Sequence, residues 1–131
     1  MLLPQDCVVA VVDGKSFDIY RNTGSEADPK LSPVDPPELE SNGHSDVGHR
    51  SSPGNHADRQ MDEDARARAL TLWLNDQVLS HQIKDLIIIA APRTLGEMRR
   101  HYHDKTREVL RKELSKDLVG SKPQDVIAAL R

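Results

Sequence analysis

The chain has 131 residues with four aromatic residues among them, a hydrophobic share of 37% and a formal net charge of −3 with histidine taken as neutral. This length bounds it to one small domain, which we expect to span residues 1–131 around a core of Val, Ile, Leu and Ala. The acidic balance argues against a general nucleic-acid binder, so any contact with RNA has to be local.

The N-terminal segment MLLPQDCVV contains no basic residue and is interrupted by Asp6, which is not typical of a secretory signal. No stretch approaches the roughly 18 apolar residues that a membrane span needs. We therefore expect a cytoplasmic protein that does not contact membranes. Cys7 directly precedes the run VVAVV, so we interpret it as a core thiol in a reducing compartment, where nothing nearby would lower its pKa for catalysis.

A β-hairpin is the first predicted element. Cys7 to Val12 is apolar and β-branched, and Asp13-Gly14 is a favoured two-residue hairpin turn. Ser16 to Arg21 then alternates apolar and polar residues, which predicts a partner strand with one face in water.

Residues 23–59 are polar and rich in proline and glycine, which predicts a long loop. Short pieces such as Lys30 to Val34 or Pro37 to Glu40 are candidates for an edge strand. We expect residues 41–58 to be mobile because their hydrophobicity is low.

A long helix is expected from Asp62 to about His81. It carries an apolar stripe at helical spacing, formed by Ala67, Leu70, Leu74 and Val78. Asp62 to Asp64 are expected in its first turn, where carboxylates interact favourably with the helix dipole.

The segment LIIIAAPRTLGEMR, residues 86–99, predicts a buried strand, a tight turn and a helix. Thr94 and Glu97 have the spacing of a capping box. Open α/β sheets present functional residues at such corners, and a helix start suits an anion. Arg93 and Arg99 are therefore candidates to grip a phosphate or a partner carboxylate. The alternative is that Thr94 and Glu97 only cap the helix and Arg93 is solvated.

The C-terminal segment is ambiguous. Residues 107–118 fit either a helical extension or an edge strand in which Leu110, Lys112 and Leu114 alternate. Ser121-x-x-Gln124 is a second possible capping box, and a short amphipathic helix is expected to follow it.

Metal and nucleophilic sites are not predicted, and no cofactor is expected. His101 and His103 would point about 200° apart on a helix and so cannot share one ion there. His44, His49 and His56 match no metal-ligand spacing. Asp13 is explained by its turn, which argues against a nuclease using two metal ions.

Three segments carry a resemblance to a known family: VVAVVDGKSFDIYRNTG, LIIIAAPRTLGEMRRHYH and KELSKDLVG. The chain resembles the bacterial host attachment protein family, which is similar to the central domain of class 1 archaeal and eukaryotic peptide-chain release factors. This resemblance implies a ribonuclease H-like α/β fold with a mixed sheet and flanking helices.

In those release factors a Gly-Gly-Gln loop before the long helix triggers peptidyl-tRNA hydrolysis. The corresponding stretch here is Gly43 to Asn55, in which Gly48, His49 and Arg50 occupy roughly that place and Gly-Gly-Gln is absent. The resemblance therefore implies association with the ribosome or RNA without peptide release.

The sequence thus predicts a non-catalytic binding protein whose partner is the ribosome or a structured RNA, with an indirect role in attachment to host cells. The expected contact residues are His49, Arg50, Arg93, Thr94, Glu97 and Arg99. One alternative is a protein-interaction module without nucleic acid, with a homodimer left open because the core is small. A second alternative is a metal-dependent hydrolase that uses the histidines.

Overall fold

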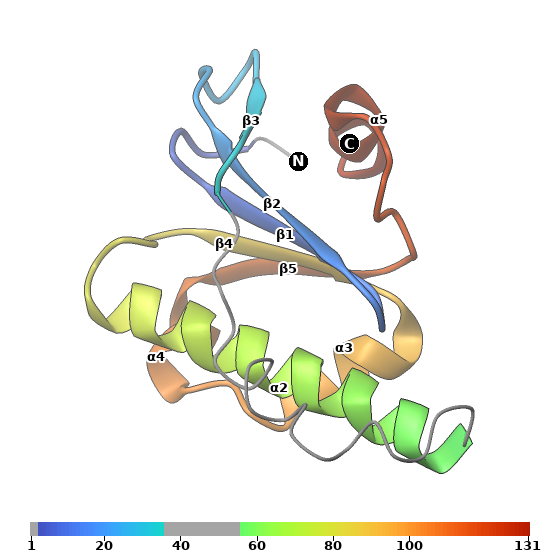
Figure 1. Ribbon diagram of the computed structural model, residues 1–131. Coiled ribbons are helices and arrows are strands. Elements are labelled where there is room, and N and C mark those ends of the chain that lie inside the picture. The colour runs from blue at the N-terminus through green and yellow to red at the C-terminus, as the bar shows by residue number, and fades with distance from the viewer. Residues whose placement is uncertain (1–2, 36–55) are drawn as a thin grey trace.

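The computed structural model describes residues 3–35 and 56–131, with side chains of the first described helix given from residue 63 onward. The elements in chain order are β1 (Val8–Val12), β2 (Phe17–Asn22), β3 (Leu31–Pro33), α2 (His56–Leu79), β4 (Leu86–Ala90), α3 (Pro92–Arg99), α4 (Asp104–Val109), β5 (Leu110–Ser115) and α5 (Pro123–Ala129). Figure 1 shows the sheet between helices, with α2, α3 and α4 on one face and α5 on the other.

The five strands form one mixed sheet in the order β3-β2-β1-β4-β5. β1, β4 and β5 are mutually parallel, whereas β2 is antiparallel to both of its neighbours. β2 is therefore the one strand of this sheet that runs against the others. The predicted α/β class with a mixed sheet and flanking helices is confirmed.

Two apolar clusters fill the faces of the sheet. The larger one, which we call the first face, joins alternate residues of the strands to the stripe of α2 and to Leu95 and Met98 of α3. The second face joins the other alternate residues to Val126 and Leu130 at α5 and to Leu3. Because both faces are covered, all five residues of β1 and all five of β4 are buried.

The predicted hairpin is confirmed, but its turn lies one residue later than expected. The Asp13 N–H donates to Ser16 O at 2.9 Å, and Asp13 Oδ1 accepts from the N–H groups of Lys15 and Ser16 at 2.7 Å each. Gly14 and Lys15 therefore form the centre of the turn. A Cβ atom on Gly14 would lie 2.5 Å from Glu63 Oε1 of α2, so glycine permits this close approach.

The prediction of one wet face on β2 is wrong. Ile19 is buried in the first face and Tyr20 in the second. The cause is α5 at the end of the chain, which covers a face that the local alternation assigned to solvent.

The long helix begins earlier than predicted. α2 starts at His56, so residues 62–64 lie beyond its first turn and residues 56–58 are helical rather than part of a loop. Its end at Leu79 is close to the expected His81, and the predicted apolar stripe is buried. Residues 41–55 of the expected mobile loop lie outside the described residues.

Residues 107–118 contain both of the alternatives, because α4 ends at Val109 and β5 follows at once. The register of β5 against β4 shifts at its start, since Leu110 pairs with Leu86 and Lys112 pairs with Ile87. Arg111 is the extra residue of this β-bulge. The expected alternation is therefore wrong at Leu110, which packs on the first face, whereas Leu114 packs on the second.

Cys7 is fully buried on the second face, as predicted for a core thiol. Burial is the main cause that raises its pKa to about 12, and the nearby charge of Asp85 adds to the shift. The thiolate is therefore not populated near neutral pH. In the part of the chain that the structure describes, no helix has the length and apolar character that membrane crossing requires.

Candidate functional site

The turn from β4 into α3 does not use the predicted capping box. Ala91 is the N-cap residue, Pro92 is the first helical residue, and no side chain caps this helix end. Proline favours the first helical position because its φ is already helical and its missing N–H is not needed there. The helix thus starts before Thr94, which is buried at its third position. The predicted box at Ser121 is also wrong, because Lys122 is the N-cap, α5 begins at Pro123, and no side chain caps this end.

Glu97 turns toward the C-terminal end of α3 instead of toward Thr94. Its Oε2 lies 2.8 Å from His101 Nε2, and its Oε1 lies 3.5 Å from Arg100 Nη1. The pairing of Glu97 with His101 at a spacing of four residues holds the segment that follows the helix. Glu97 is therefore a structural partner of that segment in the described geometry.

Arg93 lies at the N-terminal end of α3 and reaches back to α2. Its Nη2 is 3.3 Å from Asp64 Oδ2, and its side chain is 61% exposed. Exposed ion pairs of this kind contribute on the order of 0–1 kcal/mol. The guanidinium group is thus accessible, and an anionic partner can compete for it at low cost.

Arg99 lies at the other end of α3 and pairs with β5. Its Nη2 and Nε lie 2.7 and 2.9 Å from Glu113 Oε1, while Tyr102 Oη donates to Glu113 Oε2 at 2.7 Å. Burial alone would raise the pKa of Glu113, but the hydrogen bonds from Arg99 and Tyr102 outweigh it and hold the pKa below its ordinary value. Burial and the bond to Glu113 raise the pKa of Tyr102.

The bulge at Arg111 makes this cluster possible. It sets Glu113 opposite Ile88, whose side chain belongs to the first face. Without the extra residue, the alternation of β5 would turn Glu113 to the second face, away from α3. Arg111 itself is held by Asp85, with Nη2 and Nε each 2.6 Å from Oδ1.

Sequence reasoning missed Asn75, a buried polar residue on α2. Its Nδ2 donates to the carbonyl of His101 at 2.9 Å, and its Oδ1 accepts from the His103 N–H at 3.1 Å and from Thr106 Oγ1 at 2.6 Å. These bonds fix the connection between α3 and α4 on the surface of α2. The signal in the sequence was a polar residue at helical spacing within the apolar stripe.

The two histidines of HYH have separate structural roles. His101 pairs with Glu97, and His103 is the N-cap of α4, where its Nδ1 accepts from the Lys105 N–H at 3.0 Å. The described residues contain no group of three potential metal ligands. His49 and Arg50 lie outside the described residues, as does His44.

The structure therefore brings together part of the predicted site. Arg93, Thr94, Glu97 and Arg99 all lie on α3, where Thr94 is buried and the two arginines pair with carboxylates from two other elements, α2 and β5. What this arrangement offers chemically is two exposed guanidinium groups, one at each end of α3. Among these four residues no nucleophile is paired with a base.

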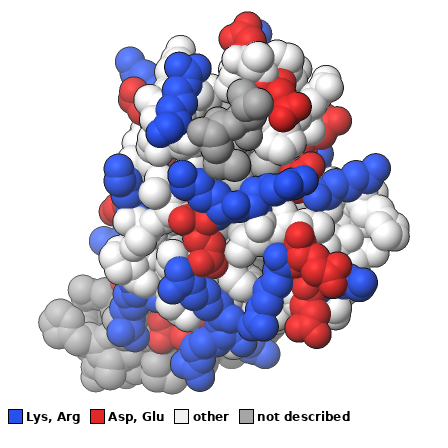
Figure 2. Space-filling model, turned by 180° about the vertical axis from the view of Figure 1, so that it is seen from behind, with Lys and Arg blue, Asp and Glu red and all other residues white. Residues whose placement is uncertain are grey.

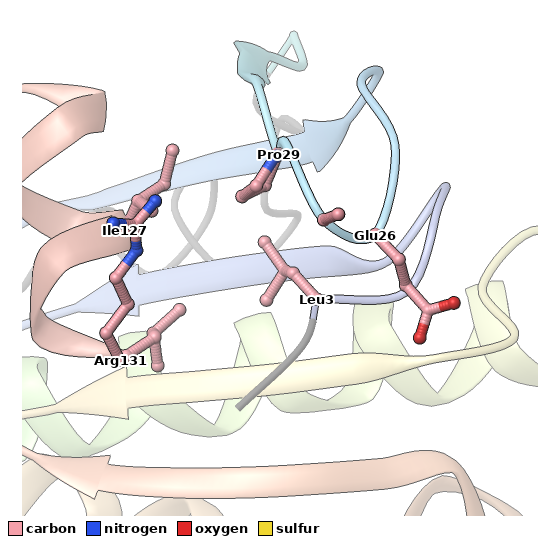
Figure 3. A pocket seen from close by; sticks show the side chains of 7 residues that line it. Leu3, Glu26, Pro29, Ile127 and Arg131 are labelled. Atoms are coloured by element: carbon pink, nitrogen blue, oxygen red, sulfur yellow. The ribbon is translucent and has the colours of Figure 1, made fainter.

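A cavity of about 420 Å³ lies on the opposite face, away from α3. Figure 3 shows Leu3 and Pro29 on one side of it, with Ile127 and Arg131 on the other. Its remaining lining residues are Glu26, Ala27 and Leu130. None of the predicted site residues that the structure describes lines this cavity.

Comparison with protein families gives a match over residues 6–130 to the model of the bacterial archaeo-eukaryotic release factor family 12. A search among curated proteins finds no match.

Proposed function

We propose, from the premise that the chain belongs to the bacterial archaeo-eukaryotic release factor family 12, that this protein binds the ribosome or a structured RNA and acts by binding. The family relation supports a ribosome-related role. The fold is proposed to be ribonuclease H-like, and the reversed direction of β2 within an otherwise parallel sheet supports that assignment. The cytoplasmic location and the indirect role in attachment to host cells stay predictions.

The observation that carries the proposal is the set of exposed arginines at the two ends of α3. Arg93, Arg99 and the C-cap residue Arg100 are 61%, 57% and 73% exposed. Guanidinium groups bind phosphate with paired hydrogen bonds, which an RNA backbone offers repeatedly. Because the Arg93–Asp64 pair is exposed and therefore weak in water, an RNA phosphate can replace Asp64 as the partner of Arg93.

Peptide release is not part of the proposal. The whole sequence lacks Gly-Gly-Gln, the motif that supplies the hydrolytic step in the release factors that the chain resembles. We propose His49 and Arg50 as a second contact region, on the strength of their place before α2. Thr94 and Glu97 act in this proposal by positioning α3.

Co-sedimentation with ribosomes tests the proposal. We expect wild-type protein to pellet with ribosomes, to be released by added salt, and to be released by ribonuclease, because phosphate contacts depend on counterion release. Arg93→Ala should weaken pelleting without changing the thermal melt. Lys84→Ala is the matched control, since Lys84 is an exposed cation in the turn before β4, at the other end of that strand.

Other outcomes identify the alternatives. Binding that survives ribonuclease and high salt would point to a protein partner, including a second copy of this chain. Hydrolytic activity that is lost both on chelation and in His49→Ala would point to an enzyme. Equal pelleting of Arg93→Ala and wild type would remove Arg93 from the binding surface.

A further inference from the structure

We infer that the β5 edge of the sheet carries a further RNA contact, a track of unpaired cations that binds the phosphate backbone of an RNA duplex. The track consists of Arg107, Lys112 and Lys116. This inference rests on the proposed function, because it names the form of RNA and a separate surface that would bind it.

Positive charge is concentrated in the C-terminal third of the chain. Residues 92–131 contain ten Lys and Arg against six Asp and Glu, whereas residues 1–91 contain eight against fifteen. The overall charge of −3 hides this asymmetry. A local basic surface is therefore present in a chain whose net charge argues against general nucleic-acid binding.

Ion pairing divides the cations of this third into two groups. The paired group has described carboxylate partners and comprises Arg93, Arg99, Arg100, Lys105 and Arg111. Arg107, Lys112 and Lys116 form no ion pair among the described residues. Neither do Lys122 and Arg131, which lie apart from β5 at the start and end of α5. The track is thus the part of the basic surface whose charge is not already neutralised.

The fold places three of these cations along one edge of the sheet. β5 is an outermost strand, and α4 leads directly into it. Arg107 precedes β5 on α4, Lys112 lies within the strand, and Lys116 follows its end. Lys122 does not belong to this edge, because the chain crosses to β2 before it, where the Gly120 N–H donates to Asp18 Oδ2 at 3.1 Å. At about 3.3 Å per residue, Lys112 and Lys116 are about 13 Å apart along the chain. Figure 2 shows Lys and Arg side chains in a band across the back of the molecule, with more below it and acidic side chains between.

Protection of an exposed edge strand is the simpler explanation for charge at this position. The other edge strand, β3, is three residues long, ends in Pro33 and carries no charged residue. Charge of either sign would protect β5, yet the acidic residue within it, Glu113, is paired with Arg99. Beside β5, Arg107, Lys112 and Lys116 form no described ion pair, and the carboxylates without one are Asp104 at the start of α4 and Asp117 next to Lys116.

The aromatic residues favour a duplex over a single strand. Proteins that bind single-stranded RNA stack its bases on accessible aromatic side chains. The four aromatic residues of this chain are Phe17, Tyr20, Trp73 and Tyr102, and each is buried or half-buried. A surface that offers cations without stacking platforms suits a backbone whose bases are already paired.

The test measures affinity for a blunt RNA duplex of mixed sequence at several salt concentrations. We expect the triple variant Arg107→Gln, Lys112→Gln, Lys116→Gln to lower the slope of log K against log salt by about 3, since each phosphate contact contributes about 1. The matched control is Lys15→Gln, Lys30→Gln, Lys84→Gln, which removes the same charge from exposed positions in residues 1–91. Asp117→Asn should tighten duplex binding.

The outcomes separate this inference from the proposed function. Equal slopes for the two triple variants, or no gain from Asp117→Asn, would overturn the track while leaving ribosome binding through α3 intact. Equal affinity for a single strand of the same length would overturn the duplex assignment. Wild-type protein that binds neither ribosomes nor duplex would overturn the proposed function together with this inference.

Discussion

The face of the sheet under α2, α3 and α4 differs from the face under α5 in what holds its covering helices. On the first face, buried polar bonds from Asn75 add to the apolar packing of a helix of 24 residues. On the second face a helix of seven residues packs through Val126, with Leu130 just beyond it. The 420 Å³ cavity also lies on this second side.

This difference matters because directional hydrogen bonds between buried groups fix the orientation of a connection in addition to apolar packing. The arginines of α3 are carried by the face whose connections are fixed by Asn75 and Glu113. The first face thus holds the proposed binding groups in place. The second face chiefly closes the core, and four changes test this division, from the largest expected effect to the smallest.

Ile88→Asp should disrupt the apolar packing of the first face and unfold the protein. Ile88 is fully buried in β4, and an unpaired carboxylate there costs an amount comparable to a total stability of about 5–15 kcal/mol. We expect no cooperative melt by circular dichroism. Ile88→Val, the matched control, should lose only about 1 kcal/mol. A normal melt of Ile88→Asp would contradict the central position of β4.

Asn75→Ala should destabilise the protein by about 3 kcal/mol in urea unfolding. The change leaves the buried Thr106 hydroxyl and the His103 N–H without their acceptor. Asp76→Ala removes an exposed neighbour on α2 and should change stability by less than about 0.5 kcal/mol. If the two variants unfold alike, the hydrogen bonds of Asn75 do not stabilise the first face.

Val126→Ala should cost about 2 kcal/mol, because it removes buried methyl groups from the contact of α5. We expect amide hydrogen exchange to accelerate in α5 while α2 stays protected, since the second face can open locally. Gln124→Ala is the control on the exposed side of the same helix. Equal acceleration in α2 and α5 would show that both faces open together.

Glu113→Gln should have the smallest effect, a fall of only a few degrees in Tm at neutral pH, because its pair with Arg99 is partly exposed. The pKa of Glu113 is lowered in the native state. Its carboxylate therefore stabilises the fold above the ordinary glutamate pKa of about 4.3, and this contribution is lost as the pH falls through the lower native value. The difference in Tm between wild type and variant should shrink in acid. A difference in Tm that does not change with pH would indicate that the variant loses stability through packing.

Much of the fold was predictable because its strands and helices follow local periodicity. The run from Leu86 and the stripe through Leu70 and Leu74 are buried as their patterns predicted. The predictions were wrong where an element distant in sequence, or a neighbouring proline, determines the local structure. α5 covers a strand face that alternation assigned to water. Pro92 starts α3 before the expected cap Thr94, whereas Pro123 starts α5 one residue later than a cap at Ser121 would require.

The site was predictable only in part, because pairing partners are distant in sequence. Arg93 and Arg99 were identified from their place after a buried strand, and the structure describes both on α3. Their partners Asp64 and Glu113 lie 29 and 14 residues away. The bulge at Arg111, which turns Glu113 toward α3, has no local sequence signature of its own.

The buried sulfur of Cys7 has a practical consequence. Since this is the chain's one cysteine and its Sγ lies under the second face, a thiol-reactive dye would label the native protein only during excursions that uncover β1. The rate of Cys7 labelling would therefore report how often such openings occur, without an engineered cysteine.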